Sequence, residues 1–373
     1  MPTTKAGFKE AQGSRNLVTG SSGLVGGRLV EMLFERGAEF VRCFDLKPAD
    51  DGLKQRVADA IKKGGRKGEV EWVVGNLTKK QEVLDACSGL THIFHIAALV
   101  GPYFPKALYY DVNYQGTLNV LDGAREHKVG KFVMSSSPST RFTGVDIEGK
   151  REDELPIPDT FLQTYAETKA MGEKAVSAAC CDSLLTVSVA PHQVYGPHDL
   201  LFLPNLLSTA GNGLLRVFGG GENICSFCYV DNYCHGLMCG ADALKKGSPA
   251  LGKFYIVTDE KPQKFWHVLN SAIVAMGFVD LFSKFKLPAL FMLFLGHICD
   301  LVSFVTGKKI KLNVFAVKML TIHRYFDISN AKRDLKYKPL FTFEEGWAVT
   351  CDWFKSNWLP KFQATKKGGK KED

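Results

Sequence analysis

The sequence predicts an α/β protein with a doubly wound parallel sheet and a smaller C-terminal substrate lobe. Short apolar runs alternate with longer amphipathic segments through the first half of the 373-residue chain, as expected where strands alternate with helices. A glycine-rich turn directly follows the first apolar run, and from about Pro191 the alternation loosens into loops. Such alternation implies right-handed crossovers and a parallel sheet whose ligand lies at the carboxyl ends of the strands.

The first strand, turn and helix form the dinucleotide-binding pattern of a Rossmann sheet. Asn16-Leu17-Val18 is the apolar run, the turn extends from Thr19 to Gly26, and 28–36 is amphipathic. Glycine permits the tight turn, lets the backbone approach a pyrophosphate, and allows the helix to pack on the strand. The free helix amides then face the phosphates. The predicted cofactor contacts here are Gly20, Ser22, Gly23, Leu24, Val25 and Gly26.

The second predicted strand, 39–45, ends in an acid that selects the cofactor. Asp45 lies about 20 residues beyond the glycines, where an acidic side chain binds the ribose hydroxyls. A 2′-phosphate would meet a like charge at this position, so the sequence predicts NAD. Arg42 and Lys47 are close enough in sequence to leave NADP open as an alternative.

The remaining elements of the predicted sheet follow in order. They are a helix at 53–67, a strand running into a loop at 71–77, a helix at 81–87, a strand at 91–98, a helix at 113–128 and a strand at 131–137. We expect Asn76 and Leu77 to lie against the cofactor, with Asn76 at the adenine. Ala97 and Ala98 are small, so the cofactor can lie close to them.

The predicted domain organisation is a dinucleotide-binding domain at 14–190, a substrate lobe at 191–360 and a basic tail at 361–373. A strand within 224–258 is expected to return to the first domain. The composition, 45% hydrophobic and 23% charged, fits one large domain or two coupled lobes with a full core.

Cysteine usage and charge narrow the function classes. The ten cysteines lack framework spacing and suit reduced thiols in the cytosol. Cys225 and Cys228 are three apart on a predicted strand and point to opposite faces, so no metal site is expected.

The net charge of +8 lies in solvated lysine runs without a nucleic-acid motif, so an anionic membrane surface is the expected partner. No apolar N-terminal region follows Met1, so we expect the catalytic part to face the cytosol.

The candidate catalytic residues are Ser137, Tyr165, Lys169 and Asn113. Tyr165 and Lys169 are four apart on an amphipathic segment and therefore share one helix face. A phenol with a pKa near 10 needs a neighbouring cation to act as a base, and Lys169 can supply the charge. Ser137 ends the preceding strand and can hold a substrate oxygen, while Asn113 can anchor a water that passes the proton to Lys169. An isolated Tyr-x-x-x-Lys pair is more often a structural feature of a helix.

The order of glycine turn, Asn113, Ser137 and Tyr165 with Lys169 resembles the extended short-chain dehydrogenase/reductase superfamily over roughly residues 14–260. The segment 191–197 is similar to the one that closes over the nicotinamide there, which implies cofactor contacts from Pro191 and Val194. The resemblance also implies that Lys169 and Tyr165 hold the nicotinamide ribose. Ala190 replaces the usual arginine, so the contact which that arginine makes in relatives is not expected.

A narrower resemblance is to the 3β-hydroxysteroid dehydrogenase family, in its branch acting on sterol 4α-carboxylates. It rests on segments 142–147, 152–156, 227–232, 255–262, 265–266, 324–327, 331–333 and 337–340. It implies NAD-dependent oxidation of a 3β-hydroxyl to the ketone, with decarboxylation at C4. Three alternatives are a 3β-hydroxy-Δ5-steroid dehydrogenase/isomerase, a relative acting on nucleotide sugars or flavonoid-type ketones, and a non-catalytic NAD-binding scaffold. No clear cation for the C4 carboxylate is evident, and His192 is the one residue considered.

The segment 287–305 is the candidate membrane contact. It is strongly apolar up to Leu295, Gly296, His297 and Asp300 interrupt its continuation, and lysines flank both ends. A span needs about 20 apolar residues, so a helix lying in the interface is predicted, with a buried core helix as the alternative. Lys370-Lys371 resembles the dilysine retrieval signal of endoplasmic-reticulum membrane proteins. We therefore expect a protein on the cytosolic face of that membrane, and a homodimer remains open.

Overall fold

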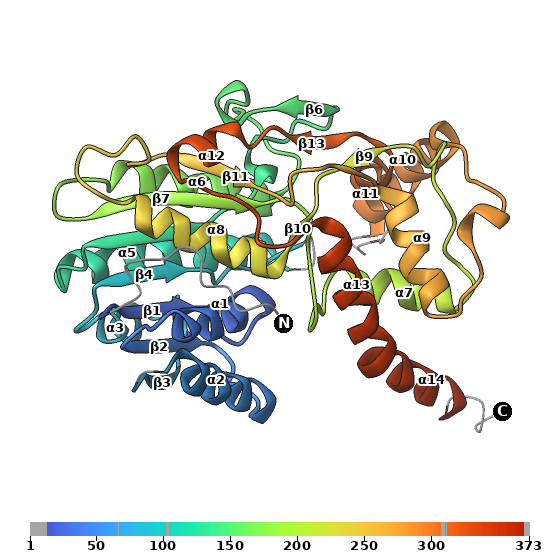
Figure 1. The fold of residues 1–373 in the computed structure, drawn as a ribbon. Coiled ribbons are helices and arrows are strands. Elements are labelled where there is room, and N and C mark those ends of the chain that lie inside the picture. The colour runs from blue at the N-terminus through green and yellow to red at the C-terminus, as the bar shows by residue number, and fades with distance from the viewer. Residues whose placement is uncertain (1–12, 66, 102–103, 307–309, 311, 369–373) are drawn as a thin grey trace.

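A computed structural model describes residues 13–65, 67–101, 104–306, 310 and 312–368. Figure 1 shows two parts, a layered α/β body that contains α1 to α6 and α8, and a mainly helical lobe that contains α7, α9 to α11, α13 and α14. The described residues end with α14, which lies on the lobe.

The body is built on one sheet of seven parallel strands. Their order is β11-β7-β5-β4-β1-β2-β3, and every pairing is parallel. The strands are β1 Arg15–Thr19, β2 Phe40–Asp45, β3 Glu69–Val74, β4 His92–His95, β5 Lys131–Ser135, β7 Leu185–Pro191 and β11 Phe254–Val257. The order reverses beside β1, and this reversal is the place where ligands bind in such sheets. The predicted doubly wound sheet is confirmed.

Helices cover both faces of this sheet. On one face α1 packs against α2 and α8, and on the other α5 packs against α3 and α6. The helices are α1 Leu24–Glu35, α2 Asp51–Gly64, α3 Lys80–Ala86, α5 Gly116–Glu126, α6 Thr164–Ala178 and α8 Val230–Ala243. The central strands are buried on both faces, and Leu17, Phe94 and Phe132 are each at most 1% exposed, as a parallel sheet covered by helices requires.

The predicted helix at 113–128 begins earlier and is not regular. The chain becomes helical at α4, Lys106–Tyr109, continues through a π-helical turn at Tyr110–Gln115, and becomes regular in α5. Asn113 therefore lies in the π-helical turn and not at a helix start. Periodicity cannot reveal such a turn because a π-bulge inserts a single residue into an otherwise helical pattern.

The lobe is assembled from short strands and the remaining helices. Its strands are β6 Ile147–Lys150, β8 Val194–Tyr195, β9 Ile224–Cys225, β10 Cys228–Tyr229, β12 Gln263–Lys264 and β13 Arg324–Phe326. Its helices are α7 Leu203–Gly211, α9 Phe265–Ala275, α10 Ala289–Thr306, α11 Val314–Thr321, α13 Phe343–Trp353 and α14 Leu359–Gly368. Helix α12, Ser329–Asp334, packs on β11 of the body. Short 3-10 turns occur at Pro138–Arg141, Glu152–Glu154 and Leu281–Ser283, and a second π-helical turn at Phe354–Trp358.

The prediction that Cys225 and Cys228 lie on one strand, within 224–230, is wrong. The segment is divided, because β9 pairs with β12 and β13 while β10 pairs with β8. The strand that returns to the seven-stranded sheet is β11, which pairs with β7 at its edge. The predicted tail at 361–373 begins as part of α14, and its dilysine lies outside the described residues, as do Lys308, Lys309 and Lys311.

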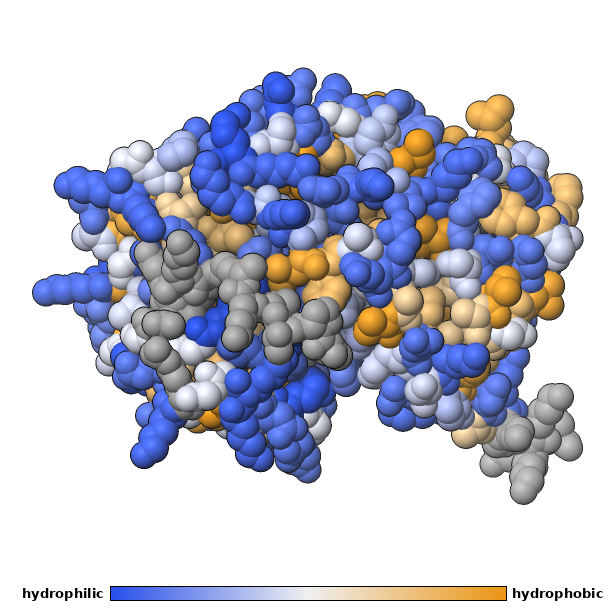
Figure 2. All heavy atoms as spheres, viewed as in Figure 1, coloured by the Kyte–Doolittle hydropathy of each residue, from blue (hydrophilic) through white to orange (hydrophobic). Residues whose placement is uncertain are grey.

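Helix α10 is the one helix of the described residues that is long and apolar enough to cross a membrane, and only 11% of it is buried. Figure 2 shows apolar side chains gathered over the lobe, while the α/β body is mainly hydrophilic on the same face. The buried-core alternative for 287–305 is wrong for this chain alone, because most of the apolar side chains of α10 face outward.

Candidate active site

The glycine turn leaves no room for larger side chains. Gly20 has a φ of +72°, and a Cβ there would lie 2.8 Å from the Ala97 Cα and amide nitrogen. A Cβ on Gly26 would lie 2.0 Å from the Gly20 carbonyl oxygen. Both approaches bring β1, β4 and α1 together at the carboxyl edge of the sheet. The result is a bare backbone cradle of the kind that a pyrophosphate needs.

The start of α1 presents its amides without side-chain caps. Gly23 is the N-cap residue and makes no side-chain hydrogen bond, and Leu24 and Val25 open the helix while packing against the hydrophobic core. Free amides at a helix N-terminus bind phosphate oxygens. The residues of the turn therefore fit a dinucleotide.

The predicted ribose-binding acid lies beside this turn. The Asp45 carboxylate accepts hydrogen bonds from the Ser22 amide at 2.9 Å and from the Lys47 amide at 3.1 Å. Arg42 is engaged elsewhere, because its guanidinium binds Glu71 at 2.7 Å and donates to the carbonyls of Ala86 and Ser88. Arg42 is therefore not available for a 2′-phosphate, and this arrangement favours NAD.

Asn76 and Leu77 follow β3 at the same edge. The Asn76 side-chain oxygen accepts from the Thr78 amide and hydroxyl, both at 3.0 Å, so it holds its own turn. Leu77 is buried against α5, where a Cβ on Gly116 would come within 2.9 Å of it. Contact of Asn76 with the adenine stays a prediction.

A row of hydrogen-bonded, buried polar side chains lies beneath the cradle, and the sequence did not predict it. Thr19 Oγ1 accepts from the Ala97 amide at 3.2 Å and bonds His95 Nδ1 at 2.9 Å, and His95 Nε2 bonds Thr117 Oγ1 at 3.0 Å. Burial, followed by the charge of Lys169, lowers the pKa of His95 to about 3, so the ring is neutral. This chain fixes the end of β4, and with it Ala97 and the partly buried Ala98. A histidine inside an apolar strand is the sequence signal that could have found it.

The predicted catalytic residues converge at the ends of β5 and α6. Ser137 lies just beyond β5 and close enough to the Tyr165 hydroxyl to favour its ionised form, and Tyr165 comes from the first turn of α6. One turn later, Lys169 is buried and its ammonium donates to the Ser135 carbonyl at 2.6 Å. A serine, a phenol and an amine thus surround one point at the carboxyl edge of the sheet.

Burial sets the protonation of this group. It lowers the pKa of Lys169 to about 8, against the opposing effect of Glu173, and it raises the pKa of Tyr165 although the bond from Ser137 acts the other way. Desolvation of the phenol is the largest effect on the pKa of Tyr165, and the expected lowering of that pKa by the charge of Lys169 stays a prediction. The resting tyrosine is therefore a protonated phenol.

Asn113 lies next to the catalytic helix. Its side-chain amide grips the Leu99 backbone, accepting from the amide at 2.8 Å and donating to the carbonyl at 3.1 Å, and it approaches Thr168 Oγ1 at 3.4 Å. Its own carbonyl accepts from the Thr117 hydroxyl at 2.7 Å. The side chain therefore fixes the loop after β4, and its predicted role in holding a water stays a prediction.

The segment after β7 passes over the same edge. Pro191 ends β7, Gln193 turns with a φ of 37°, and Val194 begins β8. His192 between them donates from Nδ1 to the Ser226 carbonyl at 2.7 Å. Burial, with Arg324 nearby, lowers the pKa of His192 to about 3, so this ring is neutral and cannot be the cation considered for a substrate carboxylate.

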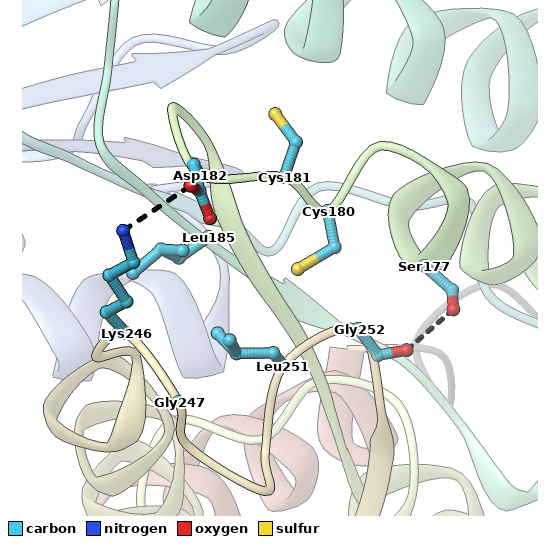
Figure 3. A pocket seen from close by; sticks show the side chains of 9 residues that line it. All are labelled: Ser177, Cys180, Cys181, Asp182, Leu185, Lys246, Gly247, Leu251 and Gly252. Carbon is cyan, nitrogen blue, oxygen red and sulfur yellow. Dashed lines mark hydrogen bonds and ion pairs between the residues drawn. The ribbon is translucent and has the colours of Figure 1, made fainter.

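A hollow on the opposite edge of the sheet is not the catalytic site. Figure 3 shows it between the end of α6, the start of β7 and the loop 246–252, with Lys246 binding Asp182 at 3.5 Å and Ser177 donating to Gly252 at 2.6 Å. Ser177 and Tyr165 lie near opposite ends of α6, roughly 18 Å apart at 1.5 Å per residue. The hollow is therefore remote from the reacting residues.

A dinucleotide cradle and a tyrosine, lysine and serine at the carboxyl edge of one parallel sheet define a Rossmann-type oxidoreductase. A family model described as the 3-beta hydroxysteroid dehydrogenase/isomerase family matches residues 17–289. The chain belongs to this family.

Similar proteins extend over most of the chain. A 3beta-hydroxysteroid-dehydrogenase/decarboxylase isoform 1 of Arabidopsis thaliana is 33% identical over 94% of this chain and 82% of its own. The decarboxylating sterol-4-alpha-carboxylate 3-dehydrogenase of Homo sapiens is 30% identical over 92% of this chain and 89% of its own. A dTDP-glucose 4,6-dehydratase of Streptomyces venezuelae, solved as a double mutant with NAD bound, shares the fold with a TM-score of 0.70 at 20% identity, covering 93% of this chain and 99% of its own.

Proposed function

We propose that this protein is an NAD-dependent dehydrogenase that oxidises the 3β-hydroxyl of a 4α-carboxysterol to the ketone, with loss of carbon dioxide from C4. The placement of Ser137 and the Tyr165 hydroxyl beside buried Lys169 is the observation that carries the dehydrogenase chemistry. The sterol substrate and the decarboxylation are supported by the names of the two relatives.

NAD would lie along the cradle of Gly20, Gly26 and Ala97 with its ribose hydroxyls at Asp45, and it supplies the hydride acceptor. Ser137 holds the sterol hydroxyl, and Tyr165 removes its proton as the hydride leaves C3. Lys169 is already positively charged below a pH of about 8, so it favours the tyrosinate as the base forms.

The product of this step decarboxylates without further machinery. Oxidation places a ketone at C3 beside the carboxylate on C4, which is a β-keto acid. The bond from C4 to the carboxylate carbon then breaks, its electron pair passes into the C3 carbonyl as an enolate, and protonation at C4 completes the reaction. One NADH and one carbon dioxide are formed for each sterol.

Purified protein assayed with NAD is expected to give equal amounts of NADH and carbon dioxide from a 4α-carboxysterol. A plain 3β-hydroxy-5-ene steroid serves as the comparison substrate. Formation of NADH from the plain steroid without carbon dioxide would instead identify the protein as a 3β-hydroxy-Δ5-steroid dehydrogenase/isomerase. A lack of NADH from both substrates would contradict the proposed reaction.

We further propose that α10 places the enzyme on the cytosolic surface of the endoplasmic-reticulum membrane. Leu290, Phe294, Leu301 and Val305 follow helical spacing and are 61% to 83% exposed. On the opposite face, Gly296 lets the backbone of α11 approach, since a Cβ there would come within 2.9 Å of the Val314 amide. One apolar face outward and one packed on α11 suits a helix lying in the interface, from which a sterol could enter.

Replacing Leu290, Phe294 and Leu301 together by aspartate should abolish co-flotation of the protein with anionic phospholipid vesicles. Each side chain contributes about 2 kcal/mol when it enters an apolar phase, so the three dominate the binding. Leu200→Asp, at a position 80% exposed outside α10, is the matched control and should still float. Equal flotation of the triple variant and the wild type would contradict the proposal.

A further inference from the structure

Arg324 is a half-buried cation without a carboxylate partner among the described residues. Its Nε is buried without a hydrogen-bond partner, and Nη2 has one weak bond, to the Met319 carbonyl at 3.4 Å. Among the described residues no aspartate or glutamate forms an ion pair with it. Burial lowers the pKa of its guanidinium. An arginine with five donors and so few bonds is costly to bury unless something else completes it.

Two other deeply placed arginines of the chain have carboxylate partners. Arg28 binds Asp231 through two bonds of 2.8 Å, and Arg141 binds Glu173 in a buried pair. Pairing of this kind is what buried charges ordinarily require. Arg324 differs from both, because the fold supplies it with no such partner among the described residues.

Arg324 lies among segments that follow β5 and β7. It begins β13, its carbonyl accepts from the Ser226 amide at 2.9 Å, and its charge acts on His192, the residue that follows β7. On the other side its guanidinium lies 5.8 Å from the ring centre of Phe142. Phe142 follows the 3-10 turn Pro138–Arg141, whose N-cap residue is Ser137. Arg324 thus lies between Phe142, on the segment that leaves β5, and His192, on the segment that leaves β7.

The same region contains packed aromatic rings, and its His192 ring is neutral. Phe142 contacts Phe315 of α11 edge-on at 6.4 Å, and His192 is neutral and contacts Phe326 at 5.1 Å. Aromatic rings suit the apolar sterol nucleus, while one guanidinium among them suits a single anionic substituent.

We propose that Arg324 binds the C4 carboxylate of the substrate and thereby sets specificity for carboxylated sterols. This inference rests on the proposed function and extends it, because it names the residue that distinguishes a 4-carboxysterol from a plain 3β-hydroxysteroid. Arg324 supplies two parallel N–H donors to the carboxylate oxygens. The substrate therefore provides the anionic partner that the fold does not provide among the described residues.

The test compares Arg324→Met and wild type on two sterols that differ only in a 4α-carboxylate or a 4α-methyl group. We expect kcat/KM for the carboxysterol to fall roughly 100-fold, mainly through KM, because a buried charged hydrogen bond is lost. For the methyl sterol the change should be below about threefold. Arg324→Lys should recover part of the loss, and Arg333→Met, which removes an exposed guanidinium of α12, should behave as wild type.

Folding and function are controlled separately. Melting temperature and NAD affinity report whether Arg324→Met is folded. If the variant is not folded, the wild-type KM for the 4α-carboxysterol is compared with the KM for its methyl ester, which lacks the negative charge. We expect at least a roughly tenfold preference for the acid. Two outcomes overturn this inference alone, provided that the wild type decarboxylates the carboxysterol. In the first, Arg324→Met has the wild-type KM for the carboxysterol. In the second, the wild type does not prefer the carboxysterol over its methyl ester. Wild type inactive on the carboxysterol overturns the proposed function itself.

Discussion

Tyr165→Phe is expected to lower turnover by about a thousandfold while NAD binding changes little. The substitution removes only the hydroxyl that Ser137 contacts, and it leaves the ring in place at the start of α6. Without the hydroxyl no group at the site is positioned to take the proton from the sterol as hydride leaves. The glycine cradle and Asp45 are untouched, so the cofactor keeps its main contacts.

The measurement is steady-state NADH formation together with NAD binding followed by protein fluorescence. Tyr110→Phe is the matched control, because it also removes one phenol hydroxyl, the one that bonds Glu167 outside the catalytic cluster, and it should retain near-normal turnover. The pH profile adds a second readout, since the loss in Tyr165→Phe should persist from pH 6 to pH 9. Turnover of Tyr165→Phe within tenfold of wild type would exclude Tyr165 as the base.

The body of the molecule could be predicted because its local signals agree with its tertiary structure. The apolar run 16–18, the glycine turn and the acid at position 45 each follow from a steric or electrostatic need that acts within a few residues. The structure places Gly20 against Ala97 and Asp45 against Ser22, as that pattern requires. Order along the chain therefore specified most of the dinucleotide site.

The lobe could not be predicted in the same way, because its short strands pair over long distances. β13 pairs with β6, some 180 residues earlier in the chain, and β9 contacts β12 and β13. This pairing brings Arg324 close to Phe142 and His192, so nothing local distinguishes it from the other basic residues of the lobe. The same holds for the π-helical turn at Asn113 and for the raised pKa of Tyr165, since both depend on packing by distant segments.

Lys169→Met should separate catalysis from stability. Turnover is expected to fall by roughly 10² to 10³, because the positive charge that favours the tyrosinate and the ammonium that is placed to hold the ribose are both lost. The apoprotein should nevertheless unfold at a higher denaturant concentration than wild type at pH 7. Lys169 is buried, and burial of its charge opposes folding, which methionine avoids.

The pH dependence of that gain follows from the two pKa values of Lys169, about 8 in the folded chain and 10.5 in the unfolded chain, where the side chain is exposed to water. Below pH 8 the lysine is charged in both states, and the folded chain bears the whole penalty, about 3 kcal/mol at most. Between pH 8 and 10.5 the unfolded chain binds more protons, so wild-type stability rises with pH and the advantage of Lys169→Met shrinks. The lost bond to the Ser135 carbonyl offsets about 1 kcal/mol of the gain.

Urea unfolding at pH 7 and pH 9.5 measures this difference, with Lys174→Met, an exposed lysine on the same helix, as the control that should show no such trend. An advantage of Lys169→Met that grows with pH would contradict the assignment of a depressed pKa. Retained turnover would remove Lys169 from the mechanism. We expect lower activity together with higher stability at neutral pH. The reaction needs the charge of Lys169, whereas burial of that charge destabilises the folded state.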